Sequence, residues 1–600
     1  LAFGARQADL YALSGGTSPS PWPLMLGTSA LVVVGIGLAS LWRIASLSGG
    51  GRKVAEGLGA TPVAPEVADP ALRRLRNVIE EVAIASGVPV PDIYVLENEP
   101  GINAFAAGYS ASDAAVCVTR GALDQLDRDE LQGVIAHEFS HVLNGDMRLN
   151  IRLMGLLFGI LVLAVAGRKM LFYGNVRVGR GSRGNGSGQV VAIALVLMVV
   201  GYVGYFFARL IQAAVSRSRE SLADASAVQF TRQTRGIAGA LKKIAITAEG
   251  SALAAPNKQE VAHMLFGEAG RFNAWFATHP PLLKRIQALE PGFGVEDLKR
   301  HARMAARKAA AAAPLPANAA GAVGADGVPG GMPGAVAAAF GAAAAGDAGR
   351  CRAAVPGTTL SDDLRAAVRQ PGSALAVLIA LACTPVPALE AAQRRIVADA
   401  FGDDVRAAAW AWRARTAALA PGLWLALTQL AFPALRQLDA GRRTSLLRVL
   451  EALVRVDGRV DFHECCLVRL LAAQLDEAAA PRRAPVDGRR KLPACRASLA
   501  LVCAVVATEG ARAADAARSA WLLAMQHAFP GQPLPWLAPP ANWQAAFDRA
   551  LADLDALVPE AKQIALESVA KVIHADGEVT PAEHALLRVI AASLHSPLVG

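Results

Sequence analysis

The stretch GVIAHEFSHVLNGD, residues 133–146, places two histidines four residues apart, with a glutamate directly after the first. Positions four apart on an α-helix lie on one face, so His137 and His141 can direct two imidazole nitrogens at a single ion. Glu138 projects beside them, where it can take a proton from a water next to a bound zinc. The alternative is a surface helix with incidental histidines. The pattern favours a zinc site with Glu138 as its general base.

A catalytic zinc needs a third protein ligand, and a second helix supplies a candidate. The stretch SRSRESLADASAVQF, residues 216–230, places Glu220 and Asp224 four apart on one face. Glu220 can complete the ligand set, while Asp224 can hold a ligand histidine through its other ring nitrogen. The alternative for this pair is a solvated acidic face beside neighbouring arginines.

The composition indicates that part of the chain lies in lipid. Hydrophobic residues make up 53% of the 600 residues, and the net charge of +10 is not gathered into a nucleic-acid-binding motif, so we expect no nucleic acid partner. Residues 22–42 are uncharged and carry tryptophan at both ends, which predicts a transmembrane helix rather than a cleaved signal peptide. Leu1 is not a methionine, and we expect the natural N-terminus to lie upstream.

Two further apolar runs, 153–166 and 190–208, flank a loop rich in glycine and arginine. They predict a hydrophobic hairpin, 153–208, that begins and ends on one side of the membrane; a re-entrant or interfacial pair is the alternative. The side that carries the ends has eight basic residues against five in the loop, and this favours cytoplasmic ends. The eight are Arg43, Arg52, Lys53, Arg148, Arg152, Arg209, Arg217 and Arg219, and the five are Arg168, Lys169, Arg177, Arg180 and Arg183.

Around the histidine motif, the periodicity predicts a small core of helices and strands. We expect a helix at 70–87, strands at 92–96, 104–109 and 114–119, and a helix at 123–144. Asp127 and Glu130 have the spacing of a capping box. Residues 103–107, with Asn103, Ala104 and Phe105, can form the edge strand on which an extended peptide substrate lies; a plain core strand is the alternative.

The second half of the chain has a different character. Residues 301–357 are dominated by Ala, Gly and Pro, which predicts a flexible linker, and 358–600 has helical periodicity almost throughout. Two segments, 446–475 and 565–594, align without gaps as a helix, an Asp-Gly turn and a second helix, with Asp461 and Thr580 as expected N-caps. These repeats resemble TerB-like helical modules. The Asp-Gly turns lack the ligand spacing of an EF-hand.

Five motifs together resemble the HtpX-like integral membrane zinc metallopeptidases. They are GINAFAAG, VTRGALDQL, DELQGVIAHEFSHVLNGD, SRSRESLADASAV and FATHPPLLKRIQAL, within about 69–290. The resemblance implies a gluzincin with one zinc per chain on His137, His141 and Glu220, with Glu138 as general base and acid and Asp224 behind the ligands. His279 resembles the family's His-Pro element and can donate to the oxyanion, with Arg285 orienting substrate or nearby carboxylates. An incidental histidine at a helix start is the alternative for His279.

We therefore expect an α+β fold: a zincin-like core with transmembrane helices, followed by an all-α C-terminal domain. The expected divisions are a membrane anchor at 1–54, a peptidase domain at 55–300, the linker at 301–357 and the helical domain at 358–600. The resemblance implies a multi-pass protein of the bacterial inner membrane, and the count of basic residues favours a cytoplasmic catalytic domain.

The expected function is that of a membrane-anchored zinc endopeptidase in membrane-protein quality control, with misfolded membrane proteins as substrates and the bilayer as a partner. One alternative is a membrane scaffold that acts through a protein partner of the C-terminal helical domain. A prenyl-protein-processing peptidase is the third interpretation, and it would need more membrane spans than the sequence shows.

Overall fold

The computed structural model describes residues 22–46, 49–177, 186–246, 279–312, 360–458, 462–481, 488–510, 513–532, 534–540, 542–575, 577 and 580–596. The chain divides into two compact units. The first is built mainly from Leu1–Ile244 and Glu249–Leu289, and the second mainly from Glu290–Leu475 and Asp487–Gly600. Most of the interval predicted as a linker, 313–357, lies outside the described residues.

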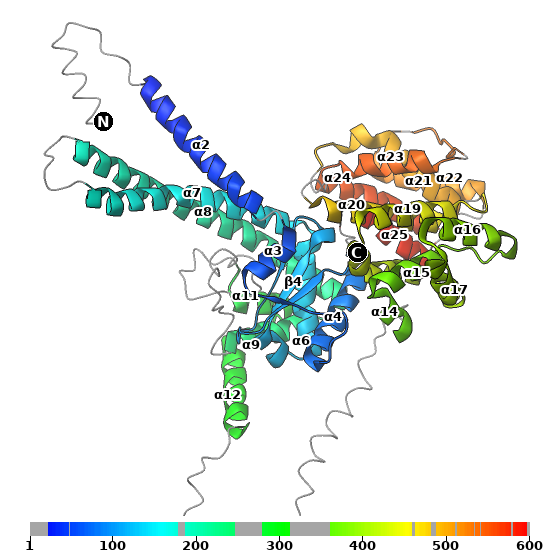
Figure 1. Cartoon of the computed structure of the whole chain (residues 1–600), viewed down its shortest axis with the longest axis horizontal. Helices are drawn as coiled ribbons and strands as arrows, with labels where there is room; N and C mark the ends of the chain where they lie inside the picture. The colour runs from blue at the N-terminus through cyan, green and yellow to red at the C-terminus, as the bar shows by residue number, and fades with distance from the viewer. Residues whose placement is uncertain are drawn as a thin grey trace, which may run out of the picture. The chain divides into compact units, whose positions relative to one another are not determined.

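Three long apolar helices dominate the first unit (Figure 1): α2 (Trp22–Ser46), α7 (Asp146–Arg177) and α8 (Gly186–Thr231). Helices α7 and α8 lie side by side, and α2 crosses α7. Helices α7 and α8 form the predicted hairpin, but both run well past the apolar runs. A helix of 46 residues, such as α8, is about 69 Å long, roughly twice the thickness of a hydrocarbon core. The segments that flank the apolar runs are therefore helical continuations of α7 and α8.

Small residues let these three helices approach closely. A Cβ placed on Gly159 of α7 would lie 2.6 Å from the Ile36 carbonyl oxygen of α2, and one on Gly167 would lie 2.5 Å from the Ala194 carbonyl oxygen of α8. Such contacts let helices pack in lipid, where the hydrophobic effect does not drive association. The outward faces carry exposed apolar side chains, among them Leu31, Val196 and Phe207.

Four described helices are long and apolar enough to cross a membrane: the three above and the segment Leu492–Gly510. In the last of these, half of the span is buried within the second unit. The bent pair α14 (Asp362–Val368) and α15 (Pro371–Leu381) would count as a fifth candidate if it were one broken span. Several apolar helices thus agree with a membrane-associated chain.

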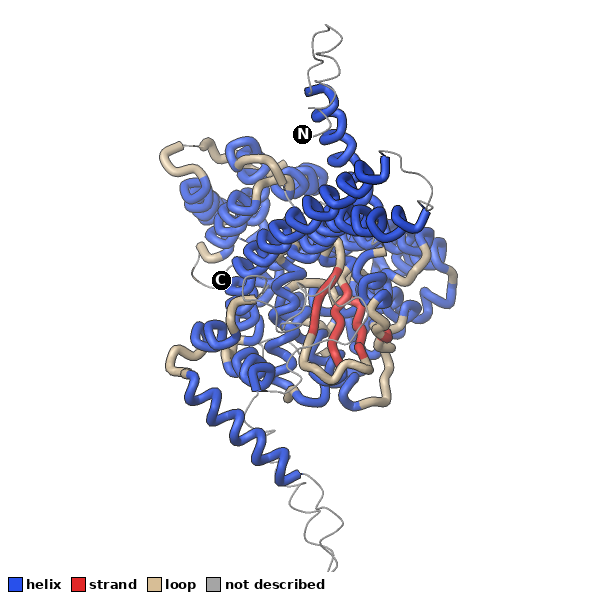
Figure 2. Tube along the Cα trace, turned by 90° about the vertical axis from the view of Figure 1, so that its left-hand side faces the viewer, coloured by secondary structure: helices blue, strands red, loops and turns tan. Residues whose placement is uncertain are grey.

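The first unit contains a four-stranded mixed sheet, drawn in red in Figure 2. Its strand order is β1-β2-β4-β3. The strands are β1 (Thr61–Pro62), β2 (Asp92–Leu96), β3 (Ala104–Ala107) and β4 (Ala115–Thr119). Strand β4 is parallel to β2 and antiparallel to β3, and Ala106 pairs with Val116. Three strands were predicted, within two residues at each end. The two-residue β1, antiparallel to β2, has no periodicity that could predict it.

Helices cover both faces of the sheet. Phe105 and Cys117 point to one face, where they pack in a core with α3 (Gly50–Gly57) and with Ile151 and Met154 of α7. Strand side chains alternate between faces, so Ala104 and Ala106 point to the other face. Strand β3 contacts α6 (Arg128–Leu143), which in turn packs on α4 (Pro70–Ser86).

Local capping explains where the helices near the sheet begin. The Asp69 side chain accepts from Ala71 N–H ahead of Pro70 in α4, and Gly87 ends that helix with φ +80°. Asp127 and Glu130 form the predicted capping box at the start of α6. The single helix predicted at 123–144 is two helices, α5 (Arg120–Gln125) and α6, because this cap starts a new helix after Leu126.

Helices α9 (Arg235–Ile246), α11 (Leu282–Leu289) and α12 (Val295–Ala312) follow later in the chain. Helix α12 therefore extends into the start of the predicted linker.

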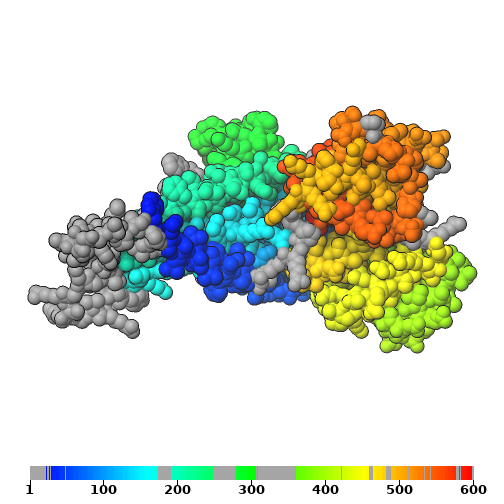
Figure 3. Space-filling model, turned by 90° about the horizontal axis from the view of Figure 1, so that it is seen from above, coloured from blue at the N-terminus to red at the C-terminus, as the bar shows by residue number. Residues whose placement is uncertain are grey.

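The second unit is helical, as predicted, and Figure 3 shows the residues after 360 in yellow-green to red. Its helices after α15 are α16 (Glu390–Phe401), α17 (Asp403–Ala417), α18 (Trp424–Arg436), α19 (Ala440–Val454), α20 (Phe462–Ala479), α21 (Arg496–Gly510), α22 (Ala514–Ala528), α23 (Gln544–Asp555), α24 (Pro559–Ile573) and α25 (Pro581–Ser593). Short 3-10 turns lie at Pro387–Leu389, Pro421–Leu423 and Leu492–Cys495.

The two aligned repeats are the helix pairs α19–α20 and α24–α25. Thr580 and Glu583 form a capping box at α25, as predicted, whereas Asp461 lies outside the described residues. Helix α21 is buried among its neighbours, with Leu499, Val502 and Cys503 in one large apolar core. The apolar character of α21 is therefore accounted for by the core of this unit.

Candidate active site

Helix α6 brings the histidine motif into the interior of the first unit. His137 is 0% exposed and Glu138 is 1% exposed. Gly133, one turn before His137, lets α6 approach α9 closely: a Cβ there would lie 2.8 Å from the Ile237 Cα. The close approach fixes the position of α6, and with it the direction of both imidazoles.

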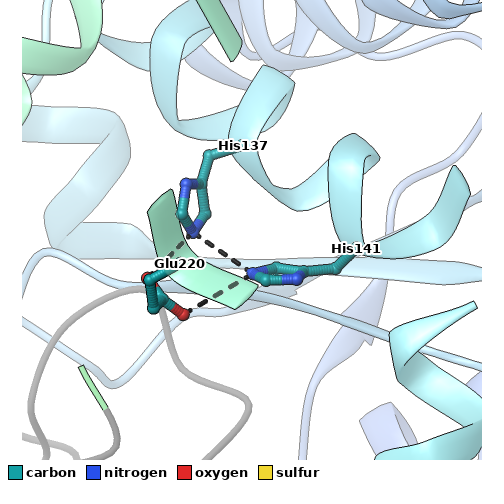
Figure 4. A group of neighbouring side chains, drawn as sticks. All are labelled: His137, His141 and Glu220. Carbon is teal, nitrogen blue, oxygen red and sulfur yellow. Dashed lines mark hydrogen bonds and ion pairs between the residues drawn. The ribbon is translucent and has the colours of Figure 1, made fainter. Parts of the chain in front are cut away.

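The two histidines of α6 and Glu220 of α8 converge on one point (Figure 4). One ligand atom from each lies within 4.8 Å of the other two. The two Nε2 atoms are 3.3 Å apart, and the Glu220 oxygens lie 3.5 Å from His137 Nε2 and 3.7 Å from His141 Nε2. Nitrogen ligands at about 2.0–2.1 Å from a tetrahedral zinc lie about 3.3–3.4 Å apart. The described side chains can therefore hold a zinc ion.

The carboxylate of Asp224 orients the first imidazole. His137 Nδ1 lies 2.9 Å from Asp224 Oδ1, so its N–H donates to Asp224 and leaves Nε2 free for a metal. Arg285 in turn donates to both oxygens of Asp224, at 2.9 and 2.7 Å, and its Nη1 lies 3.5 Å from Glu220 Oε2. The Arg285 side chain is 2% exposed. The structure thus places Arg285, predicted to orient substrate or carboxylates, against carboxylates.

The second imidazole has a carboxylate partner that the sequence reasoning missed. His141 Nδ1 lies 2.9 Å from Asp146 Oδ2, and the other Asp146 oxygen pairs with Arg219. Asp146 begins α7, and Arg219 directly precedes Glu220 on α8. Both residues stand in the quoted motifs. The signal that could have found them is that a metal-bound imidazole usually needs such a partner, and His141 had none assigned.

Burial and neighbouring carboxylates together shift the pKa values of the groups on α6. Burial raises the pKa of Glu138 to about 7, although Ala106 N–H hydrogen-bonds to this carboxylate. It also lowers the pKa of His137 to about 4. At His141, burial acts to lower the pKa, but the hydrogen bond to Asp146 and the charges of Glu220 and Glu138 outweigh it and raise the pKa to about 9. Glu138 is thus close to the pKa that suits a general base near neutral pH.

A cavity opens beside these groups. Glu138, His141, Glu220 and His279 line it, and the hairpin helices add Leu149, Asn150, Val215 and Ser216. His279 is 4% exposed, and its Nδ1 lies 2.9 Å from Glu220 Oε2. Its Nε2 has no hydrogen-bond partner among the described residues. His279 therefore lies at the site, with Nδ1 against the Glu220 carboxylate and with Nε2 lacking a hydrogen-bond partner among the described residues.

Strand β3 lies at the edge of the sheet order and next to α6. Ala106 lines the cavity. Of the three predicted substrate-binding residues, Asn103 is 1% exposed with its side chain accepting from Ala104 N–H, and Phe105 lies in the core on the opposite face. The β3 backbone, rather than these side chains, is what the strand can offer to a substrate.

The sequence of this region is similar to that of known proteins. The profile of Peptidase family M48 matches residues 71–291. A Protease HtpX homolog of Ligilactobacillus salivarius is 38% identical over 231 residues, which are 38% of this chain and 76% of the relative. Homologs of the same name from Caldanaerobacter subterraneus and Listeria monocytogenes are 36% and 38% identical, over 39% and 36% of this chain and 75% and 72% of their own lengths. No solved structure matches.

A helix with two histidines and a glutamate, joined by a carboxylate from a second helix, defines a zinc metallopeptidase site. With the profile and the relatives, the chain belongs to peptidase family M48 and is an HtpX-like, membrane-associated zinc metalloprotease. The predicted family and fold class are thereby confirmed.

Proposed function

We propose that the chain is a membrane-anchored endopeptidase in which His137, His141 and Glu220 bind one zinc ion. The observation that carries the proposal is the convergence of their three ligand atoms within 4.8 Å, each from a buried or half-buried side chain. Bound there, zinc supplies the Lewis acidity that polarises a peptide carbonyl and makes water nucleophilic at neutral pH.

In the proposed reaction, Glu138 takes the proton of the attacking water and delivers it to the leaving amine. Its burial and its pKa of about 7 support both roles, because the same group must accept and then release a proton. As an imidazolium, His279 can donate Nδ1–H to Glu220 and, through its free Nε2, a second hydrogen bond to the oxyanion of the tetrahedral intermediate. Asp224 holds His137 in the tautomer that presents Nε2, and Arg285 holds Asp224.

We propose that the substrate binds as an extended strand beside β3, with its scissile bond over Glu138. This strand is at the sheet edge, and its Ala106 lines the cavity. Residues of α7 and α8 form the rest of the wall, so the site is close to the ends of the membrane hairpin. Unfolded segments of membrane proteins at the cytoplasmic face of a bacterial inner membrane are substrates in keeping with this position.

The proposed biological role is quality control of membrane proteins, with the C-terminal helical unit recruiting a protein partner. We also propose domain boundaries after residues 54, 300 and 357, which truncation experiments can test. Mapping of cleavage sites in membrane extracts, with active and inactive enzyme, tests the substrate class: cleavage confined to soluble proteins contradicts it.

The decisive experiment uses the purified full-length chain in detergent. We expect about one zinc per chain by elemental analysis and cleavage of casein that is lost in Glu138→Gln without loss of zinc. Equal cleavage by both forms contradicts the proposal and leaves the scaffold alternative.

A further inference from the structure

A chain of three charged or titratable side chains stands behind the second imidazole. Arg219 pairs with one oxygen of Asp146, and the other oxygen lies 2.9 Å from His141 Nδ1. The Asp146 side chain is 7% exposed, and the Arg219 side chain is 41% exposed. This arrangement parallels the chain of Arg285, Asp224 and His137 on the other side of the site.

The local backbone explains how Asp146 reaches back to His141. His141 is in the last turn of α6, and Gly145 has φ +71° immediately before α7. A residue in the left-handed conformation reverses the chain tightly there, and few residues other than glycine adopt this conformation easily. Asp146 is thereby the first residue of α7 and still faces the ring of His141.

The connection also has a geometric consequence. Asp146 belongs to α7 and Arg219 belongs to α8, one residue before the proposed ligand Glu220. Their ion pair therefore joins the two hairpin helices at the point where one of them contacts the metal-binding imidazole. A salt bridge that only tied the helices together would not require the contact with His141.

We propose that Asp146 is a positioning residue for His141, and that Arg219 holds Asp146 in place. Asp146 accepts a hydrogen bond from the Nδ1–H of His141, which fixes the ring with Nε2 toward the metal and increases the basicity of that nitrogen. Arg219 neutralises the Asp146 carboxylate and fixes its orientation. Arg219 therefore affects zinc binding only through Asp146. The proposal rests on the proposed function, since it takes His141 as a zinc ligand.

The test measures the zinc dissociation constant of the purified full-length protein in detergent, by competition with a chelator. Asp146→Asn is expected to weaken zinc binding about 10- to 100-fold, the usual effect of removing such a partner. Arg219→Gln is expected to weaken it about two- to fivefold, as for a half-exposed ion pair, and Arg219→Lys is expected to restore most of the loss. In the Asp146→Asn background, Arg219→Gln should add nothing further.

Matched controls separate positioning from general loss of structure. Asp92→Asn removes the partner of Arg52 in another ion pair of the same unit, at 3.4 Å, and is expected to leave zinc affinity unchanged. If Asp146→Asn does not fold, the two Arg219 variants decide: a loss with Gln that Lys restores supports the proposal, and unchanged affinity in both overturns it. Wild-type affinity in folded Asp146→Asn also overturns it, as does full additivity of the double variant. A wild-type protein that binds no zinc would instead contradict the proposed function.

Discussion

The Nε2 atoms of His137 and His141 face each other at 3.3 Å. If both imidazoles were neutral, the two Nε2 lone pairs would point at each other and repel, because each Nδ1–H donates to a carboxylate. Because the pKa of His141 is raised to about 9 and that of His137 is lowered to about 4, we expect a single proton between the two rings to reside on His141 near neutral pH. The Nε2–H of His141 can then donate to Nε2 of His137, and this proton supplies a positive charge at the position that zinc would occupy.

Zinc must displace this proton, so zinc binding is expected to depend on pH. Below pH about 9 the metal-free site is protonated at His141, and each unit of pH lost should weaken apparent zinc affinity about tenfold. His137 is already neutral above pH about 4 and should contribute nothing in this range. Chelator competition between pH 6 and 8 measures the slope. Affinity that does not change over this range would contradict the assignment of the proton to His141.

Zinc removal is expected to destabilise the first unit. A ligand that binds only the folded state adds about 4 kcal/mol of stability at a thousandfold excess over its dissociation constant. We therefore expect chelation to lower the unfolding temperature of the wild type and of Glu138→Gln alike. Glu220→Ala should show no such shift, because the ligand set is incomplete. A chelator effect in Glu220→Ala equal to that in wild type would place the metal elsewhere.

Arg285 is expected to contribute to stability more than to substrate binding. It is buried against Asp224 and Glu220, so Arg285→Gln leaves two carboxylates with less compensation at a cost of about 3–5 kcal/mol. Bound zinc should recover part of this loss, since it neutralises Glu220. Thermal unfolding with and without zinc measures both quantities. A variant with wild-type stability and a raised KM alone would show that Arg285 contacts substrate instead.

The sequence was most informative where the chemistry is local. Positions 137 and 141 share a face of α6 because the helix repeat dictates it, and residues 220 and 224 do so on α8 for the same reason. The caps at Asp127 and Thr580 were equally visible, since each depends on a side chain three residues away. Strands with strong apolar runs were placed within two residues at each end.

The sequence alone could not show which residues, distant along the chain, come into contact in the fold. Asp146 was overlooked because its contact with His141 follows from the turn at Gly145, and because its ion-pair partner Arg219 is 73 residues away in the sequence. The burial of Arg285 depends on the return of α11 to α8. The length of α7 was underestimated because its polar ends interrupt the apolar pattern without interrupting the helix.

The membrane helices offer a test of packing that is independent of zinc. A Cβ at Gly159 of α7 would overlap the Ser40 hydroxyl of α2 and lie 2.6 Å from the Ile36 carbonyl oxygen, so Gly159→Ala must push the helices apart. Gly35→Ala on α2 is the matched control, because nothing lies within 4 Å of its Cβ and alanine favours a helix by about 1 kcal/mol. We expect Gly159→Ala to lower the unfolding temperature in detergent and Gly35→Ala to leave it unchanged or raise it. Equal stability of the two variants would mean that α2 does not pack on α7 at this point.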